Sequence, residues 1–366
     1  MKIECVKEKL QNAVSKAEKI VSKNINTPVL SCLLLETKGN ELLIRATNLD
    51  LGIEITIPIK KEKDGKVCVP ANILSSFLNS LSDDKNIKIE EKEGILAVST
   101  ERNHADIKMM TTEDFPTIPT IEDGKVCKIN TKELQNGIKS VIYSASTSSV
   151  KPELASVYVY SNEENLIFVS TDSFRLAEKI IKTKKKVDLS GVLIPAKNAA
   201  DLLKIVEGIE EDVELNSTKN QISFSLPGMY IISRVIDGTF PDYKQILPKE
   251  EKTRVVLLKQ DLINTLKTSN IFSDNFNQIN ISVNPKEKNI ETKTKNSNIG
   301  ESVNKINANI EGEEIIINFN FRYITDCLAS VPQDSVSLSF NGINKPLVIR
   351  GSTDKNFTYL VMPMNR

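Results

Sequence analysis

The sequence predicts an α+β protein that consists of three tandem copies of one domain, each with two helices packed on antiparallel sheets. Two short sequence segments each occur three times along the chain. The first occupies residues 6–14, 130–138 and 258–266, and the second occupies residues 69–78, 194–203 and 319–328. Leu78, Leu203 and Leu328 hold matching positions roughly 125 residues apart, which is the length of a domain and not of a solenoid repeat.

Composition limits the class of protein. The chain has 366 residues, of which 40% are hydrophobic, so each of three domains can build its own core. Lys plus Arg and Asp plus Glu both number 48. This balance argues against a uniformly basic polymer binder, but it allows charges that are separated by face.

Cysteine and histidine usage limits the class further. The five cysteines form no CxxC pair, which indicates the reduced thiols of a cytoplasmic protein. Because His104 is the single histidine, a histidine-based metal site is not expected, and we predict no metal and no cofactor. The chain shows no signal peptide and no apolar run long enough to span a bilayer, so we expect a soluble protein.

Apolar residues at helical spacing predict two helices in each copy. Leu10, Val14, Ala17 and Val21 mark an amphipathic helix over residues 8–22. The same spacing predicts the remaining helices at residues 73–81, 134–142, 199–206, 262–266 and 323–331.

Between the helices the sequence alternates as strands do. Residues 33–46 predict a hairpin with a turn at 38–40, and residues 157–170 repeat it. Thr47 and Thr171 close the matching strands, 124 positions apart (171 − 47 = 124). The third copy is the most diverged, and its polar stretch over residues 284–309 gives no clear strand layout.

These elements predict three domains and their linkers. The domains cover residues 1–121, 126–248 and 253–366, and linkers rich in Pro, Gly or charge lie at 118–125 and 248–253. If each domain turns the chain by a constant angle, a head-to-tail contact between chains gives a ring when it closes and a filament when it does not.

Lysines gather on the predicted helices, whereas acidic clusters such as residues 90–93 and 207–214 fall in turns or at strand starts. A neutral chain can therefore have a basic helical face that attracts phosphate without reading bases. Lysine on the wet side of a helix is also ordinary, and only its recurrence across the copies favours the functional interpretation. The candidate phosphate contacts on helices are Lys7, Lys9, Lys16, Lys132, Lys139, Lys197, Lys204, Lys259 and Arg322.

The sequence predicts no enzymatic activity, because it contains no GxxxxGK[ST], GxGxxG, HExxH or GxSxG motif. Residues 171–175 form one polar segment with catalytic residue types, and they also fit a strand-ending turn whose Asp bonds its own backbone. Two alternative classes remain open. One is a hydrolase or transferase centred on Asp172 and Arg175, and the other is a scaffold that binds proteins and does not bind DNA. The apolar residues 359–364 either complete a strand or line a surface that captures a partner.

Several segments, in order and at the right spacing, match one known family. They are residues 26–30, 114–116, 170–177, 237–243, 247–248, 319–323 and 361–364. Over its full length the chain resembles the bacterial sliding clamps, the beta subunit of DNA polymerase III.

The resemblance implies a head-to-tail homodimeric ring with pseudo-sixfold shape, which encircles double-stranded DNA without reading its sequence. Such a ring tethers the replicative polymerase and makes it processive. An apolar pocket between the second and third domains then docks the polymerase, the clamp loader and repair proteins through short linear motifs. The pocket residues implied by position are Leu154, Thr171, Ser173, Phe174, Arg175, Leu176, Pro241, Gln245, Ile246, Asn320, Tyr323, Pro346, Leu360, Val361, Met362, Pro363 and Met364.

The same resemblance implies further contacts with DNA and with a second copy. The additional DNA-facing positions are Lys23, Asn24, Ser148 and Lys151. At the dimer contact, edge strands of the first and third domains meet, with Arg102, His104 and Ile107 facing Ile271, Phe272 and Glu301.

The chain departs from the family at the implied pocket. Ser173 and Phe174 stand where Gly-His is common, and Gln245 and Asn365 stand where Arg is common. These changes make the pocket less basic and more apolar, so the preferred partner motif is expected to differ.

Overall fold

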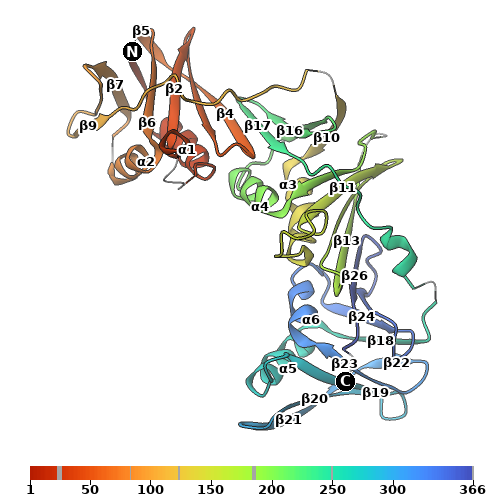
Figure 1. Ribbon diagram of the computed structural model, residues 1–366. Coiled ribbons are helices and arrows are strands. Elements are labelled where there is room, and N and C mark those ends of the chain that lie inside the picture. The colour runs from red at the N-terminus through yellow and green to blue at the C-terminus, as the bar shows by residue number, and fades with distance from the viewer. Residues whose placement is uncertain (23–26, 83, 123, 184–186, 249, 365–366) are drawn as a thin grey trace. The chain divides into compact units, whose positions relative to one another are not determined.

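The computed structural model describes residues 1–366 except 23–26, 83, 123, 184–186, 249 and 365–366 (Figure 1). The described chain separates into two compact units. The first unit contains Met1–Gln135 and Asp188–Asp237, and the second contains Asn136–Val187 and Gly238–Arg366. Both units combine helices with antiparallel sheets, which confirms the predicted α+β class.

The described part of the first unit contains two antiparallel sheets. The smaller sheet has the order β5 (Lys60–Lys63), β1 (Lys2–Val6), β7 (Asn86–Lys92), β8 (Ile95–Ser99) and β9 (His104–Lys108). The larger has the order β10 (Lys125–Asn130), β15 (Asp212–Ser217), β16 (Gln221–Leu226), β17 (Met229–Arg234), β4 (Leu51–Pro58), β3 (Glu41–Thr47), β2 (Cys32–Lys38) and β6 (Lys66–Pro70). The predicted hairpin at 33–46 is confirmed as β2 and β3.

Helices cover the strands of the first unit. They are α1 (Lys7–Glu18), α2 (Ala71–Ser80) and α4 (Ala196–Ile205), with a short 3-10 helix η1 (Pro28–Ser31). The strand β14 (Val192–Pro195) directly precedes α4. Figure 1 shows α1 and α2 side by side, and α1 packs on β3 and β4. Leu10, Val14 and Ala17 of α1 are fully buried, because the apolar stripe faces the core.

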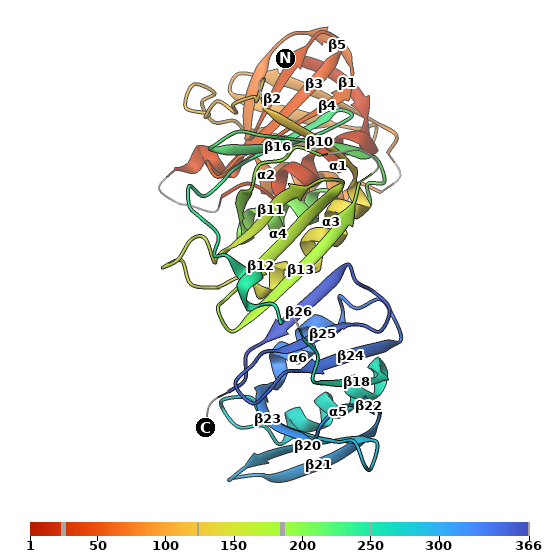
Figure 2. The same ribbon diagram turned by 90° about the vertical axis from the view of Figure 1, so that its right-hand side faces the viewer.

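The second unit is built in the same way. One run of strands has the order β11 (Ser156–Asn162), β12 (Asn165–Thr171), β13 (Arg175–Lys182), β26 (Phe357–Val361), β25 (Leu347–Gly351), β24 (Ser335–Phe340), β18 (Thr253–Leu258) and β22 (Asn309–Glu311). A smaller sheet has the order β21 (Gly300–Asn307), β20 (Asn289–Asn296), β19 (Gln278–Asn284) and β23 (Ile315–Asn320). Figure 2 shows β24, β25 and β26 side by side, which places the C-terminal strand inside a sheet.

The helical elements of the second unit are η2 (Ile142–Ser144), η3 (Tyr243–Ile246), α5 (Lys259–Ile271) and α6 (Phe321–Leu328), and α3 (Thr131–Lys139) contains the boundary between the units. All predicted helices are present, although their ends differ. The helix predicted over 8–22 ends at Glu18, and the one predicted over 262–266 extends from Lys259 to Ile271.

One contact recurs in all three predicted copies. The first residue of the first helix donates a side-chain hydrogen bond to a carbonyl near the end of the second helix. The pairs are Lys7 Nζ to Leu81 O (2.8 Å), Thr131 Oγ1 to Ile209 O (2.6 Å) and Lys259 Nζ to Val331 O (2.8 Å). Each accepting carbonyl lies one to four residues after the second helix, so the bond ties the first helix of a copy to the segment that follows the second.

Gly137 allows α3 to approach the sheet of the second unit. A Cβ atom at this position would lie 2.5 Å from Cε2 of Phe168, whose side chain is fully buried in β12. Glycine is therefore required here by close packing, although it is a poor helix former.

The stretch at 284–309 contains the strands β20 and β21 and the start of β22. The strand β20 buries Thr292 and Thr294 where other strands of the protein bury Val, Ile or Leu. Since Ile290 is followed on the inward face by two threonines, the sequence lacks the apolar alternation that marks a strand.

Candidate partner-binding pocket

The segment that joins β12 to β13 is a tight turn fixed by its own side chains. Thr171 Oγ1 donates to Arg175 O (2.6 Å) and accepts from Ser173 N (3.1 Å). Asp172 Oδ1 accepts from the backbone N–H groups of Phe174 (2.9 Å) and Arg175 (3.0 Å). Ser173 has φ of +77°, in the left-handed region that favours glycine. The turn interpretation of this segment is the one that the structure shows.

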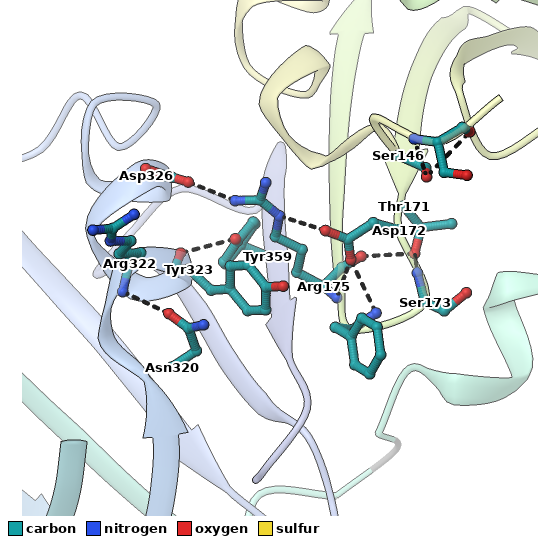
Figure 3. A network of polar contacts seen from close by, with 12 residues as sticks. Ser146, Thr171, Asp172, Ser173, Arg175, Asn320, Arg322, Tyr323, Asp326 and Tyr359 are labelled. Atoms are coloured by element: carbon teal, nitrogen blue, oxygen red, sulfur yellow. Dashed lines mark hydrogen bonds and ion pairs between the residues drawn. The ribbon is translucent and has the colours of Figure 1, made fainter. Parts of the chain in front are cut away.

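Arg175 anchors this turn to α6, as Figure 3 shows. Its Nε donates to Asp172 Oδ2 (2.9 Å), its Nη1 donates to Asp326 Oδ2 (2.5 Å), and its guanidinium lies 4.5 Å from the ring centroid of Tyr323. Burial by itself lowers the pKa of Arg175, but Tyr359, Asp326 and Asp172 outweigh it and raise the pKa. Both carboxylate oxygens of Asp172 therefore accept hydrogen bonds from residues of the turn itself.

The first unit repeats the turn at an offset of 124 residues, between β3 and β4. Thr47 Oγ1 donates to Leu51 O (3.0 Å) and accepts from Leu49 N (3.0 Å). Asn48 Oδ1 accepts from the N–H groups of Asp50 (3.0 Å) and Leu51 (2.8 Å), and Leu49 also has φ of +77°. The two copies therefore share the hydrogen bonds and the backbone strain of this turn.

A cavity of about 220 Å³ lies beside the turn in the second unit. It is lined by Lys151, Glu153, Leu154, Thr171, Ser173, Arg175, Leu176, Pro241, Asp242, Tyr243, Ile246, Leu360 and Met362. The buried side chains of Leu154, Leu176 and Leu360 give the cavity an apolar floor. Ile246 and Met362 leave apolar surface exposed at its edge, which suits an apolar guest.

Aromatic side chains hold one wall of the cavity in place. Phe240 stacks on Tyr158 with ring centroids 4.9 Å apart, and Tyr243 OH donates to Glu178 Oε2 (2.5 Å) and contacts Tyr160 OH (2.8 Å). Burial, followed by the charge of Glu178 and the bond to it, raises the pKa of Tyr243. Tyr243 therefore stays a neutral donor, and the segment that carries it is fixed.

Many of the predicted pocket residues meet at this cavity. Those that line it are Leu154, Thr171, Ser173, Arg175, Leu176, Pro241, Ile246, Leu360 and Met362. Phe174 and Gln245 are exposed next to lining residues, and Tyr323 lies under the Arg175 guanidinium.

The other predicted pocket residues do not line the cavity. Pro346 and Val361 are buried, and Pro363 is half-buried. Asn320 Oδ1 caps α6 by accepting from Arg322 N (3.0 Å), and Met364 N donates to Asn318 O (2.8 Å).

Four lining residues were not predicted as part of the pocket: Lys151, Glu153, Asp242 and Tyr243. Lys151 was expected to face DNA. Asp242 and Tyr243 follow Pro241 in the segment 237–243, so the proximity of Pro241 was the signal that could have found them.

The first unit carries a smaller counterpart of this cavity, of about 70 Å³. Thr47, Leu51, Gly52 and Ile118 line it at positions that match Thr171, Arg175, Leu176 and Tyr243. It is nearly filled because Ile118 packs on Gly52, where a Cβ atom would lie 3.1 Å from Ile118 Cγ2. The space beside this turn is therefore smaller in the first unit than in the second.

The predicted DNA-facing residues differ in how available their side chains are to a ligand. Lys7 is buried and Lys259 is half-buried, and both ammonium groups bond helix-end carbonyls, so they act within the fold. Lys9, Lys139, Lys151, Lys197, Arg322 and the loop residue Ser148 are exposed. Lys132 pairs with Glu210 (2.8 Å), Lys204 pairs with Asp201 (2.7 Å), and Lys23 and Asn24 lie outside the described residues.

Lysines of α1 and α4 lie close together in the first unit. Lys19 Nζ donates to Lys204 O (2.7 Å). Burial and then the charge of Lys19 lower the pKa of Lys16, against the opposite effect of Glu211. This lowered pKa reflects burial first and the neighbouring charge of Lys19 second.

The strands predicted at the dimer contact lie at sheet edges. The strand β9 is the last strand of its sheet in the first unit, and β21 is the last strand of the small sheet in the second. Arg102 and His104 are exposed, and His104 Nε2 lies 3.0 Å from Asp106 Oδ1. Ile107 differs from the expectation, because its side chain is buried under its own sheet.

The end of α5 and the start of β21 present apolar surface. Ile271 is 64% exposed, and Phe276, Ile299 and Val303 are also exposed. Phe272 is half-buried beside Gly300, and Glu301 pairs with Lys293 (3.2 Å). An edge strand next to such surface is a ready partner for another strand.

Within the described ranges, no group of three or more His, Cys, Asp or Glu side chains could hold a metal ion. No helix in that part of the chain is both long enough and apolar enough to cross a membrane.

Comparisons with known proteins cover nearly the whole chain. Models of the DNA polymerase III beta subunit match its N-terminal domain at residues 1–119, its central domain at 128–242 and its C-terminal domain at 244–365. The Beta sliding clamp of Synechococcus elongatus is 25% identical, over 100% of this chain and 99% of its own length. That of Staphylococcus epidermidis is 24% identical, over 96% of each chain.

Solved structures are similar as well. The DNA polymerase sliding clamp from Bacillus subtilis superposes with a TM-score of 0.94 at 26% identity, over 100% of this chain and 99% of its own. The DNA polymerase III beta subunit from Thermotoga maritima also gives a TM-score of 0.94, at 23% identity over the same shares, which shows a common fold.

Proposed function

The chain belongs to the family of the DNA polymerase III beta subunit, the bacterial sliding clamps, and we propose that two copies of it join head to tail into a ring around duplex DNA. Members of this family are processivity factors in DNA replication and not enzymes, and DNA and polymerase are their general partners. We propose the cytoplasm as the place where this chain performs that role.

The observation that carries the proposal is the threefold internal repeat. The side-chain bond from the first helix recurs in each predicted copy, at Lys7, Thr131 and Lys259. We take the copies to be residues 1–121, 126–248 and 253–366. Two chains then supply six similar domains, and a head-to-tail contact between them closes a pseudo-sixfold ring.

The proposed contact joins β9 of one chain to β21 of the other. Both are edge strands, and pairing them satisfies backbone groups that would otherwise invite aggregation. The exposed side chains of Ile271 and Val303 would be buried at this contact. Arg102, His104, Phe272 and Glu301 lie on or next to the same edges, whereas Ile107 supports its strand from below.

A closed ring does not have to grip the duplex. Exposed basic residues such as Lys9, Lys197 and Arg322 attract phosphate weakly, and salt screens them beyond about 8 Å at physiological ionic strength. Weak attraction allows sliding, while topology prevents escape. Lys7 and Lys259 are left out of this set, because their ammonium groups bond carbonyls within the fold.

The cavity beside the Thr171–Arg175 turn is the proposed docking pocket for short linear motifs of the polymerase, the clamp loader and repair proteins. Its apolar floor and exposed apolar edge fit aliphatic or aromatic anchors, which carry most of the affinity in such contacts. A polymerase tethered there gains effective concentration at the primer end.

The test uses topology. The protein is loaded by a clamp-loading complex onto nicked circular DNA, separated from free protein by gel filtration, and the DNA is then cut once. We expect retention on the circle and loss after linearisation, while a control nuclease that leaves the circle intact changes nothing. Retention that is unaffected by linearisation would contradict the ring.

A further inference from the structure

The charged groups around the pocket carry an inference about its guest. Four charged residues line the cavity: Lys151, Glu153, Arg175 and Asp242. The two positive and two negative formal charges of these residues cancel. Their partners decide what a ligand meets, because a charge that is already paired offers little to a guest.

Arg175 is not available as a cation for a ligand. Its guanidinium is engaged by Asp172 (2.9 Å) and Asp326 (2.5 Å), and its face is covered by the Tyr323 ring. Since two carboxylates surround one guanidinium, this cluster has a net negative formal charge. A carboxylate on a guest would have to compete with both.

A further carboxylate lies next to the lining. Glu178 accepts from the hydroxyl of Tyr243, which lines the cavity, and the Lys244 ammonium lies 5.5 Å from the ring centroid of Tyr160. Asp242 Oδ2 accepts from a neutral donor, Gln245 Nε2 (2.8 Å), so this bond does not neutralise the carboxylate.

Taken together, the pocket is anionic although the whole chain is neutral. Among the described residues, the cations on or next to its lining are Lys151, Arg175, Lys244 and Arg322, which lies four residues before Asp326 on α6, and the anions are Glu153, Asp172, Glu178, Asp242 and Asp326. Four positive and five negative groups leave a formal charge of −1 around an apolar floor. An apolar anchor that expels water from the cavity strengthens the effect of these charges on a neighbouring residue.

We propose that the pocket selects linear segments in which an apolar anchor pair is flanked by at least one lysine or arginine, and that it disfavours acidic flanks. This inference rests on the proposed docking function and names its partner chemistry. The apolar anchors contribute most of the affinity. The flanking cation contributes specificity between partners and raises the association rate.

The experiment begins with a ligand search that assumes no motif. A phage-displayed library of random dodecapeptides is selected on the immobilised full-length protein. Clones are then counter-screened on the Ile246→Ala/Met362→Ala variant, which removes exposed apolar edge without changing charge. Clones that lose binding on this variant depend on the pocket. We expect their flanks to be enriched in Lys and Arg and depleted in Asp and Glu.

A synthetic peptide of the leading clone is measured by fluorescence anisotropy beside an analogue with its flanking cation changed to serine. We expect the cationic peptide to bind about fivefold more tightly at low salt, and the difference to disappear in about 0.5 M salt. The Glu153→Gln/Asp242→Asn variant should lose this difference and bind the serine analogue unchanged. Glu314→Gln, a matched change at an exposed glutamate outside the lining, should keep it.

The outcomes separate this inference from the docking function. Pocket-dependent clones with neutral or acidic flanks, or a cationic preference that survives in Glu153→Gln/Asp242→Asn, would overturn the inference and leave the docking pocket intact. A selection that yields no pocket-dependent clone would overturn the docking pocket and the inference with it.

Discussion

Replacement of Ser173 by glycine should stabilise the protein. At φ of +77°, the Ser173 side chain sits in the left-handed region, which costs about 1–2 kcal/mol for a residue with a Cβ atom. Glycine avoids this cost but loses about 0.5–1 kcal/mol through the greater freedom of its unfolded chain. The hydrogen bond from the Ser173 amide to Thr171 Oγ1 uses the backbone and is kept. The balance is a gain of about 0.5–1 kcal/mol in the free energy of unfolding.

The assay is urea unfolding followed by far-UV circular dichroism, since the chain contains no tryptophan. Ser173→Ala serves as the control, because alanine keeps the Cβ atom and should give no gain. Leu49→Gly tests the same turn in the first unit, where the Leu49 side chain is 56% exposed and little burial is lost. A Ser173→Gly variant that unfolds at lower urea, or an equal gain from Ser173→Ala, would refute the strain argument.

Three further changes test separate parts of the account. Phe272→Arg should convert the dimer into a monomer in sedimentation velocity, because it places a charge at the proposed contact. The control Ile343→Arg changes an exposed residue outside the proposed contact edges and should leave a dimer. A dimer that persists in Phe272→Arg would contradict the proposed interface. Gly137→Ala should destabilise the second unit by about 1–2 kcal/mol in urea unfolding, since overpacking against Phe168 outweighs the gain in helix propensity, and a stabilised variant contradicts the close approach. Burial raises the pKa of the Cys127 thiol from 9.0 to about 11. The unfolded chain therefore loses this proton first, and stability falls as pH rises from about 9 to 11. In Cys127→Ala, the slope of the free energy of unfolding against pH should fall in this range by up to the equivalent of one proton. Equal slopes in the variant and the unchanged protein would contradict the raised pKa of Cys127.

The sequence was most informative where periodicity and repetition agreed. The stripe Leu10, Val14 and Ala17 predicted a helix, and those side chains are buried in α1. The 124-residue offset between Thr47 and Thr171 pointed to a shared element, and the structure gives both the same turn. In such places local propensity and tertiary packing demand the same residues.

The sequence was less informative where tertiary contacts decide. Lys7 and Lys259 have the pattern of solvated helix lysines, yet their ammonium groups bond carbonyls that come from 74 and 72 residues away along the chain. Thr292 and Thr294 fill core positions of β20 and hide that strand from an apolar pattern. Which charges of a pocket are already paired, as at Arg175, depends on partners distant in sequence and is readable only from the fold.

The central claim is that two chains close end to end, and the mass of the native particle in solution tests it most directly. Sedimentation equilibrium of the purified protein at micromolar concentration should give about twice the chain mass of 40.8 kDa, independent of which end is tagged. A single species of 40.8 kDa across the whole concentration range would contradict the account.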